Sequence, residues 1–329
     1  MTAPLRPMNL GEILDRTFQI YRARFLVFVG IAAIPAVVMM VIELANIFWW
    51  RLYLNDTEKI IFRLTFGDLF TMLAYYHVSL FLHLMVWPCF AQIASRTQLG
   101  EESASHPKFR PSAARWRGWI LMTISLWATT LLVPELLGVT LMAGFGYLVS
   151  EVLHLDFRFL DKALPLSFEF AIFVIILIVG AYLLLAVPAW TLENLSVRAA
   201  LRRSLTLSRG SRARIIFVRV VAPVLAWILD YLLILLPFLL FAVALRGFGG
   251  RMFFLRHRLA FNMVADTVVA ALIGPIFPIA LTLFYYDQRI RKEGFDIERM
   301  MDAAGLNTTA TLPAGDGAMA NAGAQEGQA

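Results

Sequence analysis

Four acidic residues lie within strongly apolar stretches of the chain, where a carboxylate is costly. They are Glu43, Glu135, Asp230 and Asp266. Acids inside a bilayer are candidates for function, because a charge at that depth is unfavourable without a partner. A series of such acids could carry protons or other cations, which would make the protein a small transporter.

Three of these acids have a regular spacing from the basic residues before them. Each follows an arginine by 18 or 19 residues: Glu43 follows Arg24, Glu135 follows Arg117 and Asp230 follows Arg212. Along a helix this distance is roughly 27 Å at 1.5 Å per residue, which lies beyond the middle of a bilayer. This depth favours acids that lie near the outer interface or form hydrogen bonds between helices. A cation pathway is the alternative interpretation.

Other chemistry finds little support in the sequence. His77 and His83 are six residues apart, about 240° around a helix, so they do not share a face for binding a metal. Cys89 is the only cysteine, which excludes an intramolecular disulfide and is typical of a small apolar filler. Nucleotide-binding, metalloprotease and serine-hydrolase motifs do not occur. We therefore expect no cofactor, no metal site, no catalytic residue and no enzyme activity.

The elements that carry the acids are long apolar segments. The chain is 60% hydrophobic and 16% charged, whereas soluble domains average about 45–50% and 25%. A helix needs about 20 apolar residues to cross a bilayer. Six segments satisfy this requirement, at about 25–50, 69–93, 118–147, 170–190, 220–245 and 262–286. The sequence predicts an all-α integral membrane protein with six transmembrane helices.

A basic segment precedes each odd-numbered span. The three segments are LGEILDRTFQIYRAR (10–24), FRPSAARWRG (109–118) and SVRAALRRSLTLSRGSRAR (196–214). The pattern predicts three pseudo-repeated units, each an interfacial amphipathic basic helix followed by a helical hairpin. In the first segment, Asn9 and Glu12 are spaced as in a capping box, so we expect a helix to start there.

These basic segments are amphipathic, which suggests contact with lipid. In the first, an apolar stripe contains Leu10, Ile13, Leu14, Thr17, Phe18, Tyr21 and Phe25; in the third, Val197, Leu201 and Leu205 share a face. The arginines that we expect to contact headgroups are Arg16, Arg22, Arg198, Arg202, Arg203 and Arg209. Anionic membrane lipids are the expected partners. Nucleic acid is not expected, because the basic residues are spread along the membrane boundary. An alternative interpretation is that the arginines only set topology.

The distribution of basic residues predicts the orientation. Twenty of the 29 Lys and Arg residues fall on one side of the six spans, together with both termini, and this side is expected to be cytoplasmic. Residues 1–24 then form an amphipathic arm, 25–286 the membrane domain and 287–302 a basic juxtamembrane segment. Residues 303–329 are small, polar and unpatterned, which favours a disordered tail. The N-terminus lacks the features of a signal peptide.

Three stretches resemble a bacterial family of membrane proteins. They are PLRPMNLGEILDRTFQIYRARF (4–25), ENLSVRAALRRSLTLSRG (193–210) and TLFYYDQRIRKEGFDIERM (282–300). Their pattern resembles the glycerophosphoryl diester phosphodiesterase membrane domain family, in some members of which a six-helix region is fused to a soluble phosphodiesterase. The resemblance extends over the chain to about residue 303 and implies a multi-pass protein of the bacterial inner membrane. No catalytic domain follows the last span here, so the enzymatic activity of fused members is not expected.

Two functional hypotheses follow. The first is a non-catalytic scaffold or accessory protein that contacts anionic headgroups through its basic interfacial helices. The second is a small transporter or lipid-translocating protein that uses the intramembrane acids. Phosphodiesterase activity ranks third.

Overall fold

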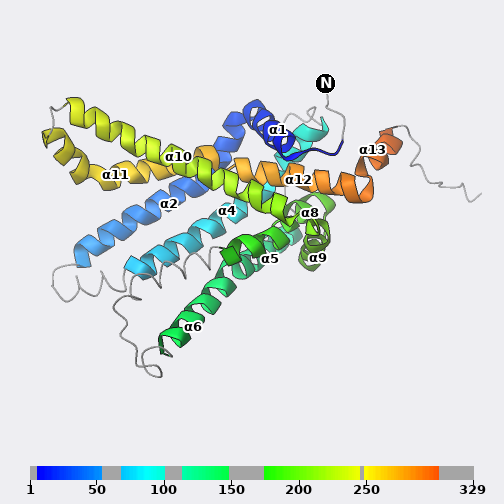
Figure 1. Cartoon of the computed structure of the whole chain (residues 1–329), viewed down its shortest axis with the longest axis horizontal. Coiled ribbons are helices and arrows are strands. Elements are labelled where there is room, and N and C mark those ends of the chain that lie inside the picture. The colour runs from blue at the N-terminus through cyan, green and yellow to red at the C-terminus, as the bar shows by residue number, and fades with distance from the viewer. Residues whose placement is uncertain (1–5, 54–67, 101–112, 148–173, 245–247, 304–329) are drawn as a thin grey trace, which may run out of the picture.

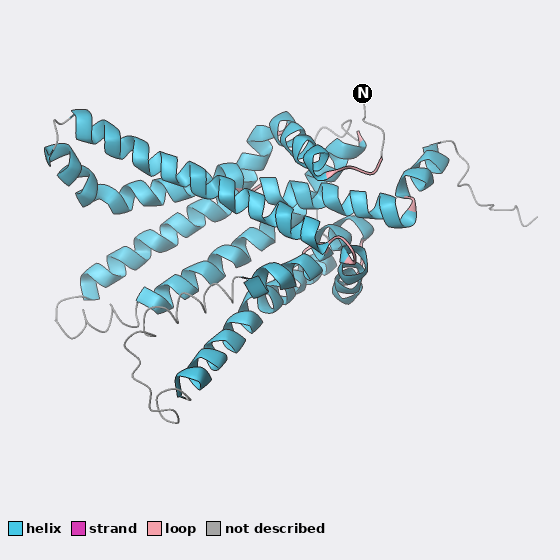
Figure 2. Cartoon of the chain, in the orientation of Figure 1, coloured by secondary structure: helices cyan, strands magenta, loops and turns pink. Residues whose placement is uncertain are grey.

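The structure is a computed structural model that describes residues 6–53, 68–100, 113–147, 174–244 and 248–303. These ranges consist of helices joined by short turns and contain no strand, which confirms the all-α prediction (Figure 2). The helices are α1 (Leu10–Ala23), α2 (Phe25–Tyr53), α4 (Asp68–Leu99), α5 (Ala113–Trp127), η2 (Ala128–Leu132), α6 (Val133–Tyr147), α8 (Ala186–Glu193), α9 (Val197–Ser208), α10 (Arg212–Ala244), α11 (Phe248–Ile273), α12 (Ile276–Glu293) and α13 (Phe295–Ala303).

Within the described ranges, six helical segments are long and apolar enough to cross a membrane, as predicted. They are Phe25–Phe48, Ala74–Leu99, Trp116–Gly138, Val174–Glu193, Arg212–Leu240 and Ala260–Glu293. The helices extend beyond the apolar residues at several ends. α10 begins at Arg212 rather than Val220, and α12 continues past Tyr286 to Glu293. Hydropathy marks only the apolar part of a helix, whereas backbone hydrogen bonding continues through the polar residues that follow.

The third span contains a local change of helix type. Its middle, η2, is a π-helix of five residues that precedes Pro134. Proline lacks the N–H that an α-helix would use at this point. The hydroxyls of Thr129 and Thr130 donate to the Ser125 and Leu126 carbonyls at 2.7 and 2.5 Å. These bonds pair backbone oxygens that lie within an apolar segment.

The sixth span is divided at Gly274–Pro275, within the GPIFP sequence where α11 ends and α12 begins. A Cβ on Gly274 would lie 2.4 Å from the Ala270 carbonyl oxygen, so only glycine fits without a backbone shift. The Tyr21 hydroxyl of α1 donates to the Leu272 carbonyl at 2.7 Å. This bond satisfies a carbonyl at the end of α11, where helices leave acceptors unpaired.

α12 is the centre of the bundle. Its residues from Ile276 to Gln288 are all buried. It contacts α1, α4, α8, α9, α10 and α13. Leu283, Phe284 and Tyr285 are at most 1% exposed and belong to the main hydrophobic core. The position of α12 therefore determines where the surrounding helices lie.

The amphipathic helices gather at one end of the molecule. Figure 1 shows α1, α9 and α13 around α12, whereas α2, α4 and α6 diverge as they leave this region. We call the end formed by α1, α9, α13 and the C-terminal half of α12 the polar end. α1 precedes the first span and α9 the fifth, as predicted. The first four residues of the second basic segment (109–112) and nearly all of the predicted tail lie outside the described residues, and the rest of that segment is continuous with α5, so the threefold repeat stays a prediction.

Candidate functional site

α9 is a short amphipathic helix that turns back against the end of the fourth span. α8 ends at Glu193 and is followed by Asn194, which has a φ of 55°. Ser196 then starts α9 by accepting a hydrogen bond from the Ala199 N–H, and α9 packs against α8. After α9, Gly210 has a φ of 76°. Glycine adopts this left-handed conformation without strain, so the chain can turn immediately into α10.

The inner face of α9 packs against the bundle through small side chains. Its buried residues are Ala200, Ser204, Leu207 and Ser208. Ser204 Oγ donates to the Tyr182 carbonyl of the fourth span at 2.7 Å. Within the predicted stripe, Val197 and Leu201 are partly buried, whereas Leu205 is 39% exposed. The buried face is thus rotated away from Leu205, which stays on the outside of the helix.

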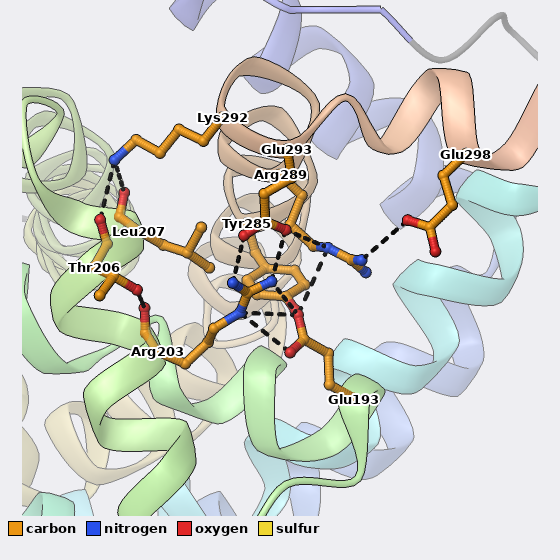
Figure 3. Close-up of polar contacts among 9 residues, drawn as sticks. All are labelled: Glu193, Arg203, Thr206, Leu207, Tyr285, Arg289, Lys292, Glu293 and Glu298. Carbon is orange, nitrogen blue, oxygen red and sulfur yellow. Dashed lines mark hydrogen bonds and ion pairs between the residues drawn. The ribbon is translucent and has the colours of Figure 1, made fainter.

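Arg203 fixes α9 by binding carboxylates from two other helices. Its Nη2 donates to Glu193 of α8 at 3.0 Å and to Glu293 of α12 at 2.6 Å. The Tyr285 hydroxyl also donates to Glu193, and Arg289 forms ion pairs with both carboxylates at 3.6 and 3.2 Å. Figure 3 shows Arg203 pointing into this group from α9, opposite α12. The network joins α8, α9 and α12.

The network stabilises the charge of Arg203. Burial works against a charged side chain, and the guanidinium is only 26% exposed. Its hydrogen bonds to Glu293 and Glu193 outweigh this effect and raise its pKa above the ordinary value. Arg203, which we expected to contact headgroups, is thereby committed to contacts within the protein.

Lys292 caps the C-terminal end of α9. Its Nζ donates to the carbonyls of Thr206, Leu207 and Arg209 at 3.2, 2.8 and 2.7 Å, and Figure 3 shows the first two bonds. The last carbonyls of a helix have no partner within the helix, and a cation satisfies them well. α9 is therefore held near its middle by Arg203 and at its C-terminus by Lys292.

Three arginine side chains on the outer side of α9 take no part in these contacts: those of Arg198 and Arg202 in the helix and of Arg209, which caps its C-terminus. Arg198, Arg202 and Arg209 are exposed and form no ion pair with any described residue. At about 100° per residue they lie within about 40° of one another around the helix. Leu205 lies next to them, between the arginines and the buried face. We call Arg198, Arg202 and Arg209 the arginine strip.

α1 has a similar arrangement. Asn9 and Glu12 form the predicted capping box, with both hydrogen bonds at 2.8 Å. The buried residues of α1 are Ile13, Thr17 and Ile20, and they face α12. Phe18 is 44% exposed, and Arg22 is exposed beside it on the helix surface. Both helices thus have a buried inner face, an exposed apolar residue and then exposed arginine.

The two predicted arginines of α1 have different surroundings. Arg16 donates to Gln98 of α4 at 2.8 Å and to Gln19 at 3.0 Å, so it helps to dock α1. Arg22 forms no such contact with a described residue. Of the six arginines predicted to contact headgroups, Arg16 and Arg203 make contacts within the protein, and the other four point outward.

A second polar centre lies around Asp287, which the sequence analysis did not identify. Asp287 is fully buried and accepts hydrogen bonds from Arg291 at 2.9 Å, Arg214 at 3.2 Å and the Met8 N–H at 2.8 Å. Both arginines also donate to the Met8 carbonyl. The centre joins the N-terminal segment to α10 and α12. The spacing of Asp287 and Arg291, four residues apart on a helix, is the signal that could have indicated it.

Three of the intramembrane acids meet at one place. Asp230 of α10 and Asp266 of α11 have their carboxyl groups within hydrogen-bonding reach. Glu43 of α2 and Asp266 line a cavity of about 40 Å³ together with Tyr75 and His83 of α4. Such a cavity can hold roughly one or two waters. Within the described ranges, these three acids form no ion pair with a basic side chain.

The fourth acid lies elsewhere. Glu135 of α6 pairs with His77 of α4.

A further charged side chain, Arg219 of α10, lies deeper than the basic segment that precedes its span. Its Nη1 is buried, lacks a partner among the described residues and occupies the space where a Cβ of Gly180 would stand. Arg219 is not among the residues that the sequence pattern singled out.

The site contains little that could hold a metal. No group of three His, Cys, Asp or Glu side chains converges as a metal site within the described residues. His77 and His83 point to different partners, since His83 Nδ1 donates to the Ser79 carbonyl at 2.7 Å. Cys89 is a half-buried free thiol.

Taken together, six apolar spans and a polar end with amphipathic helices define a multi-pass helical membrane protein. Residues 157–310 match the family described as the membrane domain of glycerophosphoryl diester phosphodiesterase, which confirms the resemblance over that region. The match includes α8 to α13 and the stretches 193–210 and 282–300, but not the stretch 4–25. No curated protein and no solved structure matched the chain.

Proposed function

We propose that the protein is a non-catalytic component of the bacterial inner membrane that holds anionic lipid headgroups at its polar end. In this proposal the polar end and both termini face the cytoplasm, where anionic lipids attract basic segments. The arginine strip of α9 and Arg22 of α1 make the contacts. Arg203 and Lys292 keep α9 in place so that the strip points outward. The protein then serves as a scaffold or accessory in a process of the cell envelope or its lipids.

The observation that carries the proposal is that the arginines of α9 have different surroundings. Arg203 lies between two carboxylates, whereas the arginine strip has no acidic partner among the described residues. Leu205, exposed beside the strip, suits the shallow apolar region below the headgroups. A role in topology alone would require the positive charges but not this arrangement of faces.

The proposal is tested with spin-labelled lipids in reconstituted vesicles. The association of spin-labelled phosphatidylglycerol relative to phosphatidylcholine is measured for the wild type and for Arg198→Gln/Arg202→Gln/Arg209→Gln. The preference for the anionic lipid falls severalfold in the triple variant, since each basic residue near an anionic surface contributes on the order of 1 kcal/mol. An unchanged preference contradicts the proposal.

A matched control has the same change in net charge at the other end of the fold. Arg251→Gln/Arg256→Gln/Arg258→Gln alters three residues in the N-terminal part of α11, away from α9. This control keeps the preference of the wild type if the arginine strip is responsible. An equal loss in both triple variants indicates a general effect of net charge instead.

A second candidate function, cation-coupled transport, is favoured by the meeting of Asp230, Asp266 and Glu43. Glu43 and Asp266 line a small cavity and Asp230 adjoins Asp266, an arrangement that could pass a proton. The test is proton flux into proteoliposomes, driven by a potassium gradient with valinomycin and followed with a pH-sensitive dye. Flux that is lost in Asp230→Asn and kept in Asp15→Asn supports transport. Wild-type flux no greater than that of empty vesicles contradicts proton transport.

A further inference from the structure

A groove lies at the polar end between the third span and the turn into α9. It has a volume of about 710 Å³, within the range of about 300–1,000 Å³ that is usual for ligand sites. Its lining comes from α5 on one side and from the end of α8 and the start of α9 on the other. The residues that matter here are Gly118, Leu121, Trp190, Ser196, Val197 and Arg198.

The floor of the groove is apolar. Leu121 of α5 is 56% exposed and lines it, together with Val197 of α9. Gly118 lets α5 lie close to Trp190 beside the groove, because a Cβ there would lie 3.3 Å from the Trp190 ring. An apolar channel beside two spans is a suitable place for an acyl chain.

The rim of the groove is positively charged. Arg198 lines it and belongs to the arginine strip, and the first N–H groups of α9 lie beside it. Among the described residues that line the groove, none is acidic. Glu193, the nearest acid along the chain, is bound by Arg203 and Tyr285. The rim therefore favours an anionic group such as a phosphate.

The tryptophans around the groove are typical of the membrane interface. Trp116 and Trp119 of α5 stack with their ring centroids 5.2 Å apart at the start of the third span, and Trp190 lies near the end of the fourth. Tryptophan is enriched at the level of the headgroups. A groove at this depth receives a headgroup on its rim and an acyl chain on its floor.

We propose that this groove is a binding site for a single anionic phospholipid, with the phosphate at Arg198 and an acyl chain along Leu121. This inference rests on the proposed function, which it makes more specific. The arginine strip attracts anionic lipid in general, and the groove retains one molecule.

The test counts bound lipid by native mass spectrometry on the full chain, purified in detergent and incubated with phosphatidylglycerol or phosphatidylcholine. The wild type retains one phosphatidylglycerol. Leu121→Trp fills the groove and loses this lipid, and Leu136→Trp, at an exposed leucine of α6 outside the groove, retains it. Arg198→Gln lowers the ratio of retained phosphatidylglycerol to phosphatidylcholine by about fivefold.

Two results overturn the groove site: a wild type that retains no lipid, or a Leu121→Trp variant that retains as much as the wild type. These failures are distinct from failure of the proposed function. Leu121→Trp leaves every arginine in place. If the arginine strip attracts anionic lipid, this variant therefore keeps the preference for anionic lipid in the spin-label experiment, whether or not the groove binds a lipid. Loss of that preference only in the arginine-strip triple variant supports the proposed function independently.

Discussion

Asp287 and Asp230 are both aspartates of helices that cross the bilayer, but their partners differ. Asp287 is fully buried at the polar end and is bound by Arg214 and Arg291. Asp230 lies in the fifth apolar span beside another acid, Asp266, and its Oδ1 is buried without a partner in the described part of the chain. The difference indicates that Asp287 stabilises the fold through its ion pairs. Asp230 has no such ion pair among the described residues, so we do not expect it to stabilise the fold in this way.

The largest expected effect comes from removing the charge of Asp287. Asp287→Asn leaves Arg214 and Arg291 without a counter-charge and weakens the attachment of the Met8 backbone. We expect a loss of about 2–4 kcal/mol, somewhat below the full cost of breaking a buried ion pair because both arginines can still reach water. Thermal unfolding in detergent, followed by tryptophan fluorescence, measures the change. Asp15→Asn, at an exposed position of α1, is the control and keeps the melting temperature of the wild type.

The adjacent arginines of α9 provide the next comparison. Arg203→Gln strands two carboxylates, and we expect α9 to lose about 1–3 kcal/mol of its docking energy. Arg202→Gln removes an exposed charge and changes stability by less than about 0.5 kcal/mol. Hydrogen exchange of residues 197–208 measures both effects. Equal exchange in the two variants would show that Arg203 does not hold α9.

Removing the charge of Asp230 is not expected to lower the stability, in contrast to Asp287. Asp230→Asn removes a charge that has no cationic partner within the described ranges, so no opposite charge is stranded. The melting temperature should stay the same or rise slightly. A drop as large as that of Asp287→Asn would show that Asp230 has a structural partner, and the contrast between the two aspartates would fail.

The smallest expected effect concerns the cap of α1. The backbone hydrogen bond from Asn9, followed by the bond from Arg6, lowers the pKa of Glu12 from its ordinary value of 4.5. A carboxyl with a lowered pKa in the folded state stabilises the fold above its unfolded pKa, and the contribution is lost as the pH falls through the folded value. Hydrogen exchange at residues 10–13, corrected for intrinsic rates, should therefore rise on acidification below about 4.5. Glu12→Gln keeps a capping residue without the charge, and its exchange should lack this pH dependence.

The spans and the capping box could be predicted from the sequence because each depends on local pattern. A run of about twenty apolar residues is enough to predict a span, and the Asn9–Glu12 spacing is enough to predict the capping box. The inner face of α9 was predicted less well than that of α1, whose predicted stripe includes the buried Ile13 and Thr17. Ala200, Ser204 and Ser208 are not hydrophobic enough to mark a buried face, yet small residues allow close approach of helices within a membrane protein.

Apart from the local pair of Asp287 and Arg291, the contacts of the polar networks could not be predicted, because they join residues far apart in the chain. The contacts of Arg203 with Glu293 and of Asp287 with Met8 depend on the central position of α12 in the bundle. For the same reason, the sequence gives equal weight to Arg202 and Arg203. Their opposite roles depend on a rotation of about 100° around one helix. The convergence of Asp230, Asp266 and Glu43 likewise depends on how three spans pack.

The most direct test of the account measures the depth of the outer side of α9 in a bilayer. Spin labels are attached at Arg202→Cys and Leu205→Cys in a Cys89→Ser background, and their collisions with oxygen and with a water-soluble nickel chelate are compared. The account predicts that the label at 205 favours oxygen, as in shallow hydrocarbon, and that the label at 202 reports the headgroup level. Labels at both positions that meet the nickel chelate as freely as one at Asp15→Cys would contradict the contact between α9 and lipid.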